Sequence, residues 1–489
     1  MALNETSQPL ELLLTVSRDA GGTLGAQIEE GLRQAIRTRA VKPGAAVPST
    51  RDLARQLGVS RRVVVDAYGQ LAAEGYLSLR QGARPRVSDA PAAANGHEPP
   101  PAPEPPPRFD FRPSVPDVSS FPRAAWLRAT REALATMPDA DLQYGDWIGL
   151  ETLRQALADY LGRVRGVVAD ASRVVITSGY TQALTLLCHA LATGGARRIA
   201  VEDPANPEQL LIARRAGLEP VPIAVDDDGL RVQELGTEDA VVVTPTHQFP
   251  TGVALSAQRR AELIEWAERG DRLIIEDDYD AELCRERVGA LQGLAPDRVL
   301  YIGSASKRLT PGMRLGWMLP PSWLSWALIS AKAIEDAGSE IAGQLALADF
   351  IARGELERHL RRMRLRYAQR RETLLAALAR ELPDWRPYES GGGLHLLTFL
   401  PDHVDEPALL AAAARHGVGI EGLSLHSYTG GCPPGLVLGH AHMAQPAIER
   451  GVQLLSDALD ATAPGSSRLR SAIPRKCVDV PDLGSLLQD

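Results

Sequence analysis

The chain has 489 residues, of which 44% are hydrophobic and 23% are charged. It is too long for one ordinary domain, and its composition is typical of a globular protein that buries large cores. No apolar run approaches the roughly 20 residues that cross a bilayer, and the N-terminus lacks the basic start and apolar core of a secretory signal. The four cysteines have no paired spacing, which predicts free thiols in a reducing compartment, the cytoplasm, rather than disulfides or a zinc site.

Charge is distributed unevenly along the chain. The net charge is −8, but residues 21–88 contain eleven basic and five acidic side chains, a balance of +6 that leaves −14 for the remainder. A basic N-terminal region on an acidic body suggests that only the N-terminal region contacts a polyanion.

This basic region predicts three helices. Apolar residues recur at every fourth position from Leu24 to Ile36, the pattern of a first amphipathic helix. A second, short helix begins after a cap at Ser49 or Thr50, and a tight turn at residues 58–60 leads into a third. Two short helices joined by a Gly-containing turn form a helix-turn-helix, whose second helix enters the major groove of DNA.

The third helix and the segment after it contain the candidate DNA contacts. Arg61 and Arg62 lie on the first turn of that helix, where an arginine can bind guanine through two hydrogen bonds. The stretch "LSLRQGARPRVS" predicts a basic hairpin, or wing. A packing module with a solvated charged face is the alternative, but the turn, the caps and the one-sided charge together favour double-stranded DNA as the partner. The predicted DNA-binding residues are Ser49, Arg51, Ser60, Arg61, Arg62, Arg80, Gly82 at the wing tip, and Arg84.

Residues 89–108, "DAPAAANGHEPPPAPEPPPR", predict a linker. Its prolines favour extended polyproline II at ~3.1 Å per residue, which makes a semi-rigid spacer. The linker separates a domain at residues 10–88 from a second at 109–462, with a large subdomain at about 140–340 and a small one at about 341–462. Residues 463–489 show no periodicity and are predicted to form a flexible tail.

Short apolar runs alternate with amphipathic stretches after residue 109, which predicts an α/β fold. Each run is continuous, as expected for parallel strands buried on both faces, and polar residues follow its carboxyl end, where such sheets place ligands. The runs begin at Arg173, Arg198, Ala240, Arg272 and Arg298.

One lysine is conspicuous because the chain has only four lysines against 49 arginines. Lys307 lies in "GSASKRLTPGMRLGW". A guanidinium is effectively always protonated, whereas a lysine amine can lose its proton in a suitable site and attack an aldehyde. The neighbouring side chains of Ser304, Ser306 and Arg314 are suited to hold a phosphate.

Two further strand ends complete a candidate cofactor site. Backbone N–H groups of Gly179, Tyr180 and Thr181 begin a helix and can bind an anion there. Asp277 ends another strand, where its carboxylate would keep a pyridine nitrogen protonated. This set predicts a site for pyridoxal 5'-phosphate, with Lys307 as the residue that forms the Schiff base.

The chain resembles a known family on these motifs. "VPSTRDLARQLGVSRRVVVDAYGQLAAEGYL" is similar to the winged helix-turn-helix of GntR-family bacterial repressors, and "TSGYTQAL", "IIEDDYD" and "GSASKRLTPGMRLGW" are similar to motifs of fold-type I aminotransferases, in the same order. From about Leu24 to Asp457 the chain resembles the MocR subfamily of GntR regulators. The resemblance implies a winged helix-turn-helix, a Pro-rich linker, and an aminotransferase-like domain with a mostly parallel sheet and a smaller C-terminal α+β subdomain.

The resemblance also implies roles for single residues. Asp277 would pair with the cofactor's pyridinium, and Tyr279 would bond the phenolic oxygen of its ring. Tyr144 would reach the phosphate in the partner subunit, which implies a homodimer, head-to-tail in MocR proteins. A bacterial regulator of this kind is expected in the cytoplasm, on the nucleoid when bound to DNA.

The chain departs from the family pattern at several positions. Asn206 stands where a tyrosine usually stacks on the cofactor ring, and Phe249 where aminotransferases have an asparagine, so His247 or Gln248 is the candidate replacement donor. Val63 stands where a groove-facing polar residue is usual. Residues 421–449 contain no Arg or Lys, although aminotransferases bind the substrate α-carboxylate through an arginine in that region, and neutral groups replace such a clamp poorly.

Three functions are compatible with these observations. The favoured one is a transcriptional regulator that senses pyridoxal phosphate, an amine or an amino acid through Lys307, and is not primarily an enzyme. The second is a working aminotransferase that carries a DNA-binding domain. Residual transaminase activity is also compatible with the first function, the regulator. The third is a DNA-binding protein whose body binds no cofactor. No metal site is expected, and the paired His440 and His442 are expected to be packed core residues.

Overall fold

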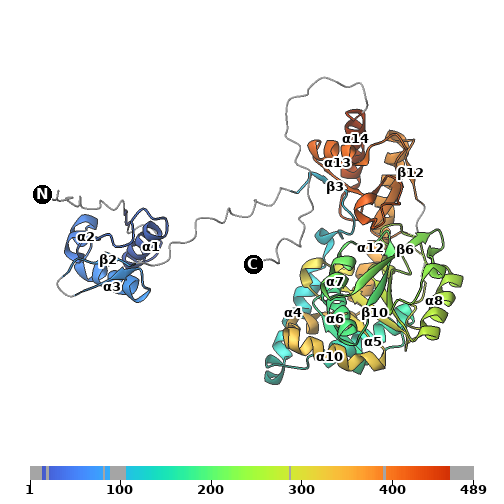
Figure 1. The fold of residues 1–489 in the computed structure, drawn as a ribbon, viewed down its shortest axis with the longest axis horizontal. Helices are drawn as coiled ribbons and strands as arrows, with labels where there is room; N and C mark the ends of the chain where they lie inside the picture. The colour runs from blue at the N-terminus through green and yellow to red at the C-terminus, as the bar shows by residue number, and fades with distance from the viewer. Residues whose placement is uncertain are drawn as a thin grey trace. The chain divides into compact units, whose positions relative to one another are not determined.

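A computed structural model describes residues 14–17, 21–80, 83–88, 106–285, 288–388 and 392–462. The chain divides into two compact units, Met1–Pro105 and Pro106–Asp489 (Figure 1). The division falls inside the predicted linker, most of which lies outside the described residues, as do Gly82 and residues 463–489. Among the helices that the structure describes, none combines the length and apolar character needed to cross a bilayer.

The N-terminal unit is a helix-turn-helix followed by a hairpin, as predicted. Ser49 accepts a hydrogen bond from the backbone N–H of Asp52, and Ser60 accepts one from Val63, so both caps form. Between the two helices Gly58 adopts φ 64°, the left-handed conformation that glycine tolerates best. The elements are α1 (Leu24–Arg37), α2 (Thr50–Leu57), α3 (Arg61–Ala73), β1 (Leu77–Ser78) and β2 (Arg86–Val87), with β1 and β2 antiparallel.

An eight-stranded sheet forms the centre of the second unit, in the order β4-β11-β10-β9-β8-β5-β6-β7. All five predicted runs are strands in it. Neighbouring strands from β10 to β6 pair in parallel, whereas β11 is antiparallel to β10 and β4. The strands are β4 (Val175–Thr177), β5 (Arg198–Asp203), β6 (Glu219–Asp226), β7 (Gly229–Leu230), β8 (Ala240–Val243), β9 (Leu273–Asp278), β10 (Val299–Ser304) and β11 (Gly316–Leu319).

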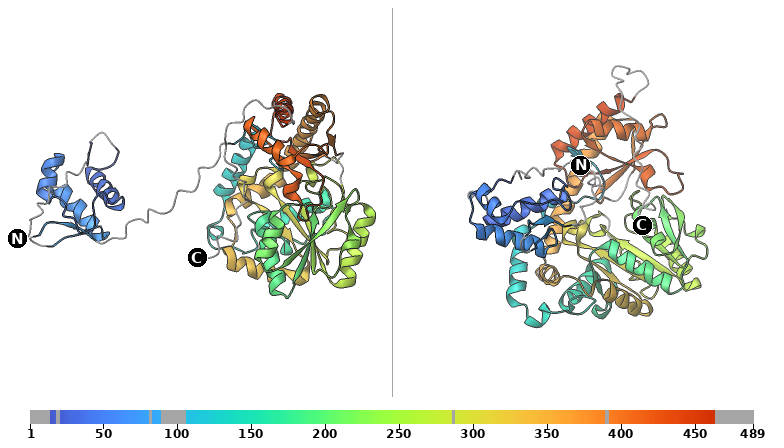
Figure 2. Two further views of the ribbon diagram at one scale, coloured as in Figure 1. Left: turned by 45° about the horizontal axis from the view of Figure 1, so that its top comes forward. Right: turned by 60° about the vertical axis from the view of Figure 1, so that its left-hand side comes forward.

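Helices cover both faces of this sheet (Figure 2). One face packs against α6 (Tyr180–Thr193), α7 (Glu208–Arg215) and α10 (Ser322–Asp336). The other packs against α5 (Glu151–Arg165), α8 (Ala257–Gly270), α11 (Ile341–Ala352) and the start of α12 (Glu355–Glu381), and α4 (Arg123–Thr136) lies against α11. This is the doubly covered α/β arrangement that the continuous apolar runs predicted.

A smaller α+β subdomain is built around a second sheet, in the order β12-β13-β16-β15. It also takes in the segment that follows the predicted linker, because β3 (Phe109–Asp110) pairs in parallel with β14 (Val418–Gly419) and Phe111 is buried in its core. Its other elements are β12 (Arg386–Pro387), β13 (His395–Phe399), β15 (Glu421–Gly422), β16 (Gly435–Gly439), α13 (Glu406–Arg415), α14 (Gln445–Asp460) and the end of α12.

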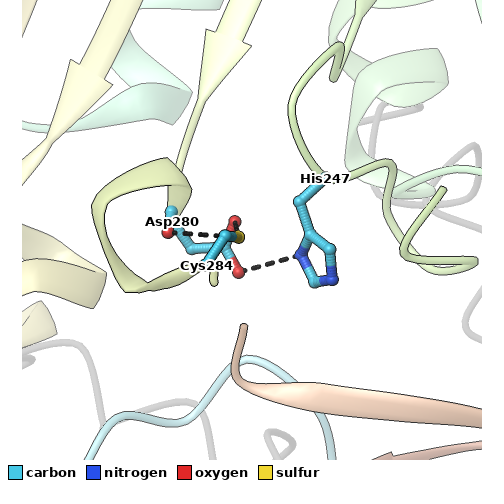
Figure 3. A group of neighbouring side chains, drawn as sticks. All are labelled: His247, Asp280 and Cys284. Carbon is cyan, nitrogen blue, oxygen red and sulfur yellow. Dashed lines mark hydrogen bonds and ion pairs between the residues drawn. The ribbon is translucent and has the colours of Figure 1, made fainter. Parts of the chain in front are cut away.

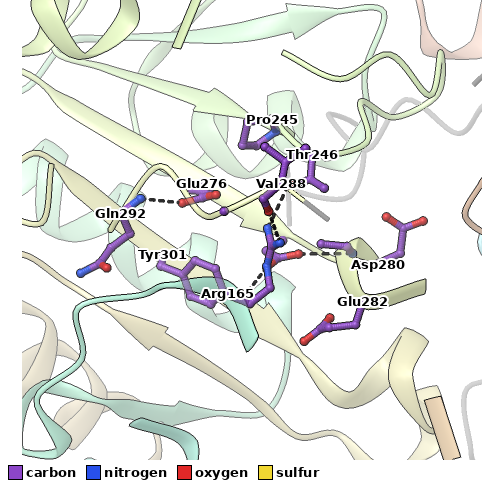
Figure 4. Close-up of polar contacts among 12 residues, drawn as sticks. Arg165, Pro245, Thr246, Glu276, Asp280, Glu282, Val288, Gln292 and Tyr301 are labelled. Atoms are coloured by element: carbon purple, nitrogen blue, oxygen red, sulfur yellow. Dashed lines mark hydrogen bonds and ion pairs between the residues drawn. The ribbon is translucent and has the colours of Figure 1, made fainter. Parts of the chain in front are cut away.

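A buried charge cluster fixes the carboxyl end of β9. Asp278 bonds the Arg165 guanidinium of α5 at 2.8 Å and lies 3.7 Å from the guanidinium of Arg308, and all three side chains are almost fully buried. Figure 4 shows Arg165 among the polar side chains that surround it, including Tyr301 and Glu282. Burial opposes ionisation, but the two guanidiniums hold the pKa of Asp278 below its ordinary value. Arg308 belongs to the four-residue helix α9 (Ala305–Arg308) and directly follows Lys307, so the cluster also fixes the helix that carries Lys307.

We expect Asp278→Asn to destabilise the C-terminal unit by roughly 3–5 kcal/mol, because it leaves the buried Arg165 without its paired carboxylate, whereas Arg308 keeps its ion pair with Glu282. All seven tryptophans lie between Trp126 and Trp385, so tryptophan fluorescence during urea unfolding reports on this unit alone.

Arg269→Ala is the matched control, because it removes an exposed pair with Glu265 at 3.8 Å. Such pairs contribute about 0–1 kcal/mol. Equal unfolding free energies for the two variants would contradict a structural role for the cluster.

Candidate functional site

A cavity of about 460 Å³ lies where the carboxyl ends of the central strands meet the small subdomain. The strand-end loops of the large sheet form most of its wall, Pro113 and Ser114 contribute from the segment after β3, and Glu421 and His426 contribute from the small subdomain. The predicted cofactor-site residues that line it are Lys307, Asp277, Tyr279, Ser304, Ser306, Arg314, Tyr180, Thr181 and Asn206.

Lys307 extends from α9 into this cavity. Its Nζ donates a 2.5 Å hydrogen bond to the backbone carbonyl of Ser114. Burial lowers the pKa of Lys307, and the carboxylates of Asp280, Asp277 and Glu208 oppose that change only in part. The site therefore favours the neutral, nucleophilic amine more than water does.

An anion-binding corner lies beside the lysine. Arg314 adopts φ 51°, an uncommon left-handed conformation for a residue with a side chain. Its guanidinium lies against Gly179: a β-carbon added to Gly179 would be only 3.1 Å from a guanidinium nitrogen of Arg314. Gly179 also has φ 122°, a conformation that favours glycine. Ser304 and Ser306 are joined by a 2.9 Å hydrogen bond between their hydroxyls. Among the described residues Arg314 forms no ion pair, so its charge remains available to an anion.

Asp277 and Asp278 point to opposite faces of the sheet, because successive strand residues alternate. Asp278 enters the charge cluster, whereas Asp277 lines the cavity and is hydrogen-bonded to Tyr180. Burial, and next the negative charge of Asp278, raise the pKa of Asp277 well above its ordinary value. In the described part of the chain no basic side chain pairs with Asp277, so a cation in the cavity would restore its ionisation.

The hydroxyl of Tyr279 contacts a buried histidine–aspartate pair. Figure 3 shows that pair, His247 and Asp280, beside Cys284. His247 lies behind Tyr279 rather than in the cavity wall. Its Nδ1 is 2.9 Å from the Tyr279 hydroxyl and 3.0 Å from Asp280 Oδ2. Its Nε2 is buried without a partner among the described residues.

These contacts determine where the proton sits. A proton on Nε2 would be buried without an acceptor, whereas a proton on Nδ1 is shared with the Asp280 carboxylate, so the Nδ1–H tautomer is favoured. The Tyr279 oxygen then accepts from Nδ1–H, which leaves its own O–H free to donate into the cavity. Burial, and next the charge of Asp280, raise the pKa of Tyr279, so the phenol stays protonated.

Cys284 adjoins this pair. Its thiol lies 3.8 Å from Asp280 Oδ1, and burial raises its pKa well above the ordinary value. The ligand atoms of His247, Asp280 and Cys284 lie within 4.8 Å of one another, a spacing that can hold a metal ion. The sequence analysis expected no metal site and did not connect the histidine with a cysteine 37 positions away.

Other predicted residues lie at the edge of the cavity or outside it. Tyr144 is 93% exposed and does not line the cavity. The side-chain oxygen of Asn206 caps the backbone N–H of Glu208, and no hydrogen bond holds it toward a ring. Gln248 donates instead to the backbone carbonyls of Pro204 and Phe249, both at 2.7 Å. His440 is fully buried, as expected for a core residue, whereas His442 is only partly buried.

Ser114, Glu421 and His426 are among the cavity residues that were not predicted from the sequence. Ser114 contributes a backbone carbonyl, which no side-chain pattern can reveal. Within residues 421–449 the predictions concerned the missing cation and the pair His440 and His442, and not Glu421 or His426. Its glutamate and histidine were a readable signal, since a carboxylate in that place has the charge opposite to the absent arginine.

In the N-terminal unit, the predicted DNA-binding residues have two kinds of placement. Ser49 and Ser60 are helix caps, whereas the basic side chains are exposed on α2, α3 and the wing. These are Arg51, Arg61, Arg62, Arg80 and Arg84. Val63 packs against the core beside α1 instead of facing outward, and Val65 is the exposed apolar residue of α3. An exposed valine there can contact a thymine methyl group.

Comparisons with known proteins agree with both parts. Residues 24–87 match the bacterial regulatory proteins of the gntR family, and residues 116–423 match aminotransferase class I and II. The chain is 33% identical over 449 residues to the HTH-type pyridoxine biosynthesis transcriptional regulator PdxR of Corynebacterium glutamicum, covering 89% of this chain and 96% of that one. It is 32% identical over 497 residues to the probable rhizopine catabolism regulatory protein MocR of Rhizobium meliloti, covering 95% and 100%.

A solved structure similar to the C-terminal unit is that of the kynurenine aminotransferase of Pyrococcus horikoshii in complex with PMP. The two chains are 26% identical with a TM-score of 0.66, and the match covers 72% of this chain and 90% of that one. The molecule thus combines a DNA-binding domain of regulators with an aminotransferase fold. The chain belongs to the MocR subfamily of GntR-family transcriptional regulators, in which an aminotransferase-like domain follows the helix-turn-helix.

The tautomer of His247 is directly testable. We expect correlation spectra of ¹⁵N-histidine-labelled protein to show protonated Nδ1 and unprotonated Nε2 for His247, assigned by comparison with His247→Gln. Asp280→Ala should remove this preference, because the carboxylate that holds the proton is gone, whereas Cys284→Ser should keep it. A wild-type signal with protonated Nε2 would show that Tyr279 donates to His247 and not into the cavity.

Proposed function

We propose that this regulator binds operator DNA through α3 and the wing, holds pyridoxal phosphate in the cavity, and changes its DNA binding when a small molecule occupies the same site. The small molecule is pyridoxal phosphate itself, an amine or an amino acid. Reduced, unpaired cysteines are compatible with action in the cytoplasm, where the DNA is.

One observation carries the cofactor assignment: three side chains in one cavity each lack a binding partner, and pyridoxal phosphate would supply all three partners. The Lys307 amine has a lowered pKa, the Arg314 guanidinium has no ion pair within the described residues, and the Asp277 carboxyl has no basic partner there. They match the aldehyde, the phosphate and the pyridine nitrogen of pyridoxal phosphate, and a cavity of about 460 Å³ is within the usual size of ligand sites.

The residues of the chain have distinct tasks in this proposal. When bound, pyridoxal phosphate supplies an aldehyde that reacts with primary amines. Arg314, the two serine hydroxyls and the start of α6 hold the phosphate. Asp277 holds a proton on the ring nitrogen, Tyr279 donates its O–H to an oxygen of the ring, and Lys307 supplies the amine.

A homodimer is part of the proposal. Apolar side chains on residues 142–147 and on α10 are exposed, including Tyr144 at 93% and Ile334 at 88%. Exposed apolar groups gathered in this way are typical of subunit interfaces. Tyr144 is then available to a partner subunit, which supports its predicted role at the partner's phosphate.

The second candidate is a working aminotransferase. It is favoured by Lys307 and Asp277 in one cavity, and by 31% identity over 321 residues to the aromatic-amino-acid aminotransferase 1 of Thermococcus litoralis, over 62% of this chain. It is disfavoured by the cavity lining, because among the described residues that form it only Lys307 and Arg314 are Lys or Arg. Turnover of an amino acid with a keto acid, unchanged by mutations in α3, would favour the enzyme.

We expect the purified protein to retain pyridoxal phosphate through dialysis, with visible absorbance that Lys307→Ala removes. Arg314→Ala should weaken retention by roughly 10- to 150-fold, since a hydrogen bond to a charged group contributes ~1.5–3 kcal/mol. Lys42→Ala, in the N-terminal unit, is the control and should retain the absorbance. Identical absorbance in the Lys307→Ala protein would exclude the assignment of this lysine.

For DNA, Arg61→Ala combined with Arg62→Ala should weaken binding to the intergenic region beside the gene by roughly 30-fold or more, because each base contact contributes ~1–3 kcal/mol. Arg269→Ala, on the exposed face of α8, should have no effect. A mobility-shift assay over a salt series measures both, and wild-type affinity should fall steeply with salt. Absence of binding at low salt by the wild-type protein would refute the regulator.

A further inference from the structure

The small subdomain contributes a buried histidine and a carboxylate to the cavity. Glu421 lies on β15, and His426 ends the short 3-10 helix Leu423–His426 that follows it. Glu421 Oε1 is 3.0 Å from His426 Nε2. The Glu421 side chain is 25% exposed, whereas that of His426 is 2% exposed. The buried histidine thus lies in close contact with the carboxylate, and the carboxylate is the more exposed of the two.

This pair is tied to the cofactor side of the wall. The backbone carbonyl of His426 accepts from the N–H of Ala205, and Tyr428 donates its hydroxyl to the carbonyl of Asn206 at 2.8 Å. The backbone N–H of Tyr428 also donates to Asp203 at 2.9 Å. These bonds hold the loop after β15 against residues 203–206, so the position of Glu421 is set by the same elements that line the site of Lys307.

His426 itself has unused capacity. Both of its ring nitrogens are buried and make no hydrogen bond among the described residues, although Nε2 lies 3.0 Å from Glu421 Oε1. The ring packs edge-to-face with Phe249, with centroids 5.1 Å apart. A buried polar atom without a partner is costly in a folded protein, and it marks a place where a ligand or water completes the bonding.

The cavity wall is acidic as a whole. Four of its lining side chains carry carboxyl groups, Glu202, Glu208, Asp277 and Glu421, whereas Lys307 and Arg314 belong to the amine and phosphate ends of the proposed cofactor site. The guanidinium of Arg112 interacts electrostatically with Glu421 but does not line the cavity, and it makes two hydrogen bonds of 2.7–2.8 Å to Asp110. Among the described residues no Arg or Lys therefore forms a close ion pair with Glu421, and its close ionisable partner there is His426.

We propose that Glu421, positioned by His426, binds the second ammonium group of a diamine effector. This inference rests on the proposed function, because the first amino group of the diamine lies at the Lys307 end of the cavity. An ammonium group bound here gains a charge-assisted hydrogen bond. A carboxylate in the same place is repelled by Glu421 and has no cation to meet, which distinguishes this effector class from α-amino acids and ω-amino acids.

Three ligands with the same four-carbon chain test the inference: 1,4-diaminobutane, butylamine and 4-aminobutanoate. Calorimetric titration of the full-length protein loaded with pyridoxal phosphate should show 1,4-diaminobutane binding at least about 10-fold more tightly than butylamine, equivalent to ~1.4 kcal/mol, and 4-aminobutanoate binding most weakly. Glu421→Gln should reduce the advantage of the diamine to about 2-fold or less.

Controls separate the possible failures. Glu449→Gln makes the same change of charge on an exposed residue of α14 and should leave the ligand order unchanged. The inference is wrong if 4-aminobutanoate binds as tightly as the diamine, and loss of that binding in Arg112→Ala would assign its carboxylate to Arg112. Retained cofactor absorbance with no diamine preference refutes this inference alone, whereas absence of cofactor absorbance in the wild-type protein refutes the proposed function as well.

Discussion

The ion pairs of Asp278 with Arg165 and Arg308 hold the functional half of the molecule together. They join three separate pieces at one point: the end of helix α5, the end of strand β9 and the short helix α9. The strand and the short helix each carry a candidate functional residue directly beside the anchored one, Asp277 on the strand and Lys307 on the helix. A buried charge tolerates little displacement from its partner. The ion pairs of Asp278 therefore fix the distance between the Asp277 carboxyl and the Lys307 amine in the cavity.

The sheet's alternation explains how one dipeptide serves two purposes. Asp277 and Asp278 are chemically alike, yet the pKa of one is raised and that of the other lowered, since only the second meets guanidiniums. A similar division holds for Tyr279 and Asp280, where the phenol faces the cavity and the carboxylate turns inward to His247. Four consecutive residues thus supply both the lining of the site and its support.

Features that depend on local chemistry were predictable from the sequence. The serine caps of α2 and α3, the Gly58 turn and the five buried strands follow from spacing and residue type, and Lys307 was conspicuous among arginines. Strand β6 was not predicted because two prolines interrupt it and much of it is only partly buried, and β11 is a four-residue strand within a stretch interpreted as a phosphate loop. The pairing of β3 with β14 joins residues about 300 positions apart, which local patterns do not encode.

The candidate site shows the same limit more sharply. Asp277, Lys307 and Arg314 were found because an aspartate, a lysine and an arginine in this order are chemically specific, whereas Glu421 in the same lining was not found. The geometry of the site was not predictable from the sequence, because the contacts of Lys307 with Ser114 and of Tyr279 with His247 depend on tertiary packing. The departure at Val63 also had a structural reason, because helix α1 covers that side chain and Val65 faces outward.

The hydrogen bond from Lys307 to Ser114 has a thermodynamic consequence. Ser114 has φ 65° and lies eight residues after Pro106, where the second unit begins, so the lysine holds a conformationally strained segment that continues toward the DNA-binding domain. Any ligand that engages the Lys307 nitrogen competes with this carbonyl. The bond is worth about 1.5–3 kcal/mol, and this sets the scale of any coupling that passes through it. That scale is comparable to the 1–3 kcal/mol typical between allosteric sites, so under the proposed function the Ser114 carbonyl is a place where occupancy of the cavity can act on the conformation of residues 106–114.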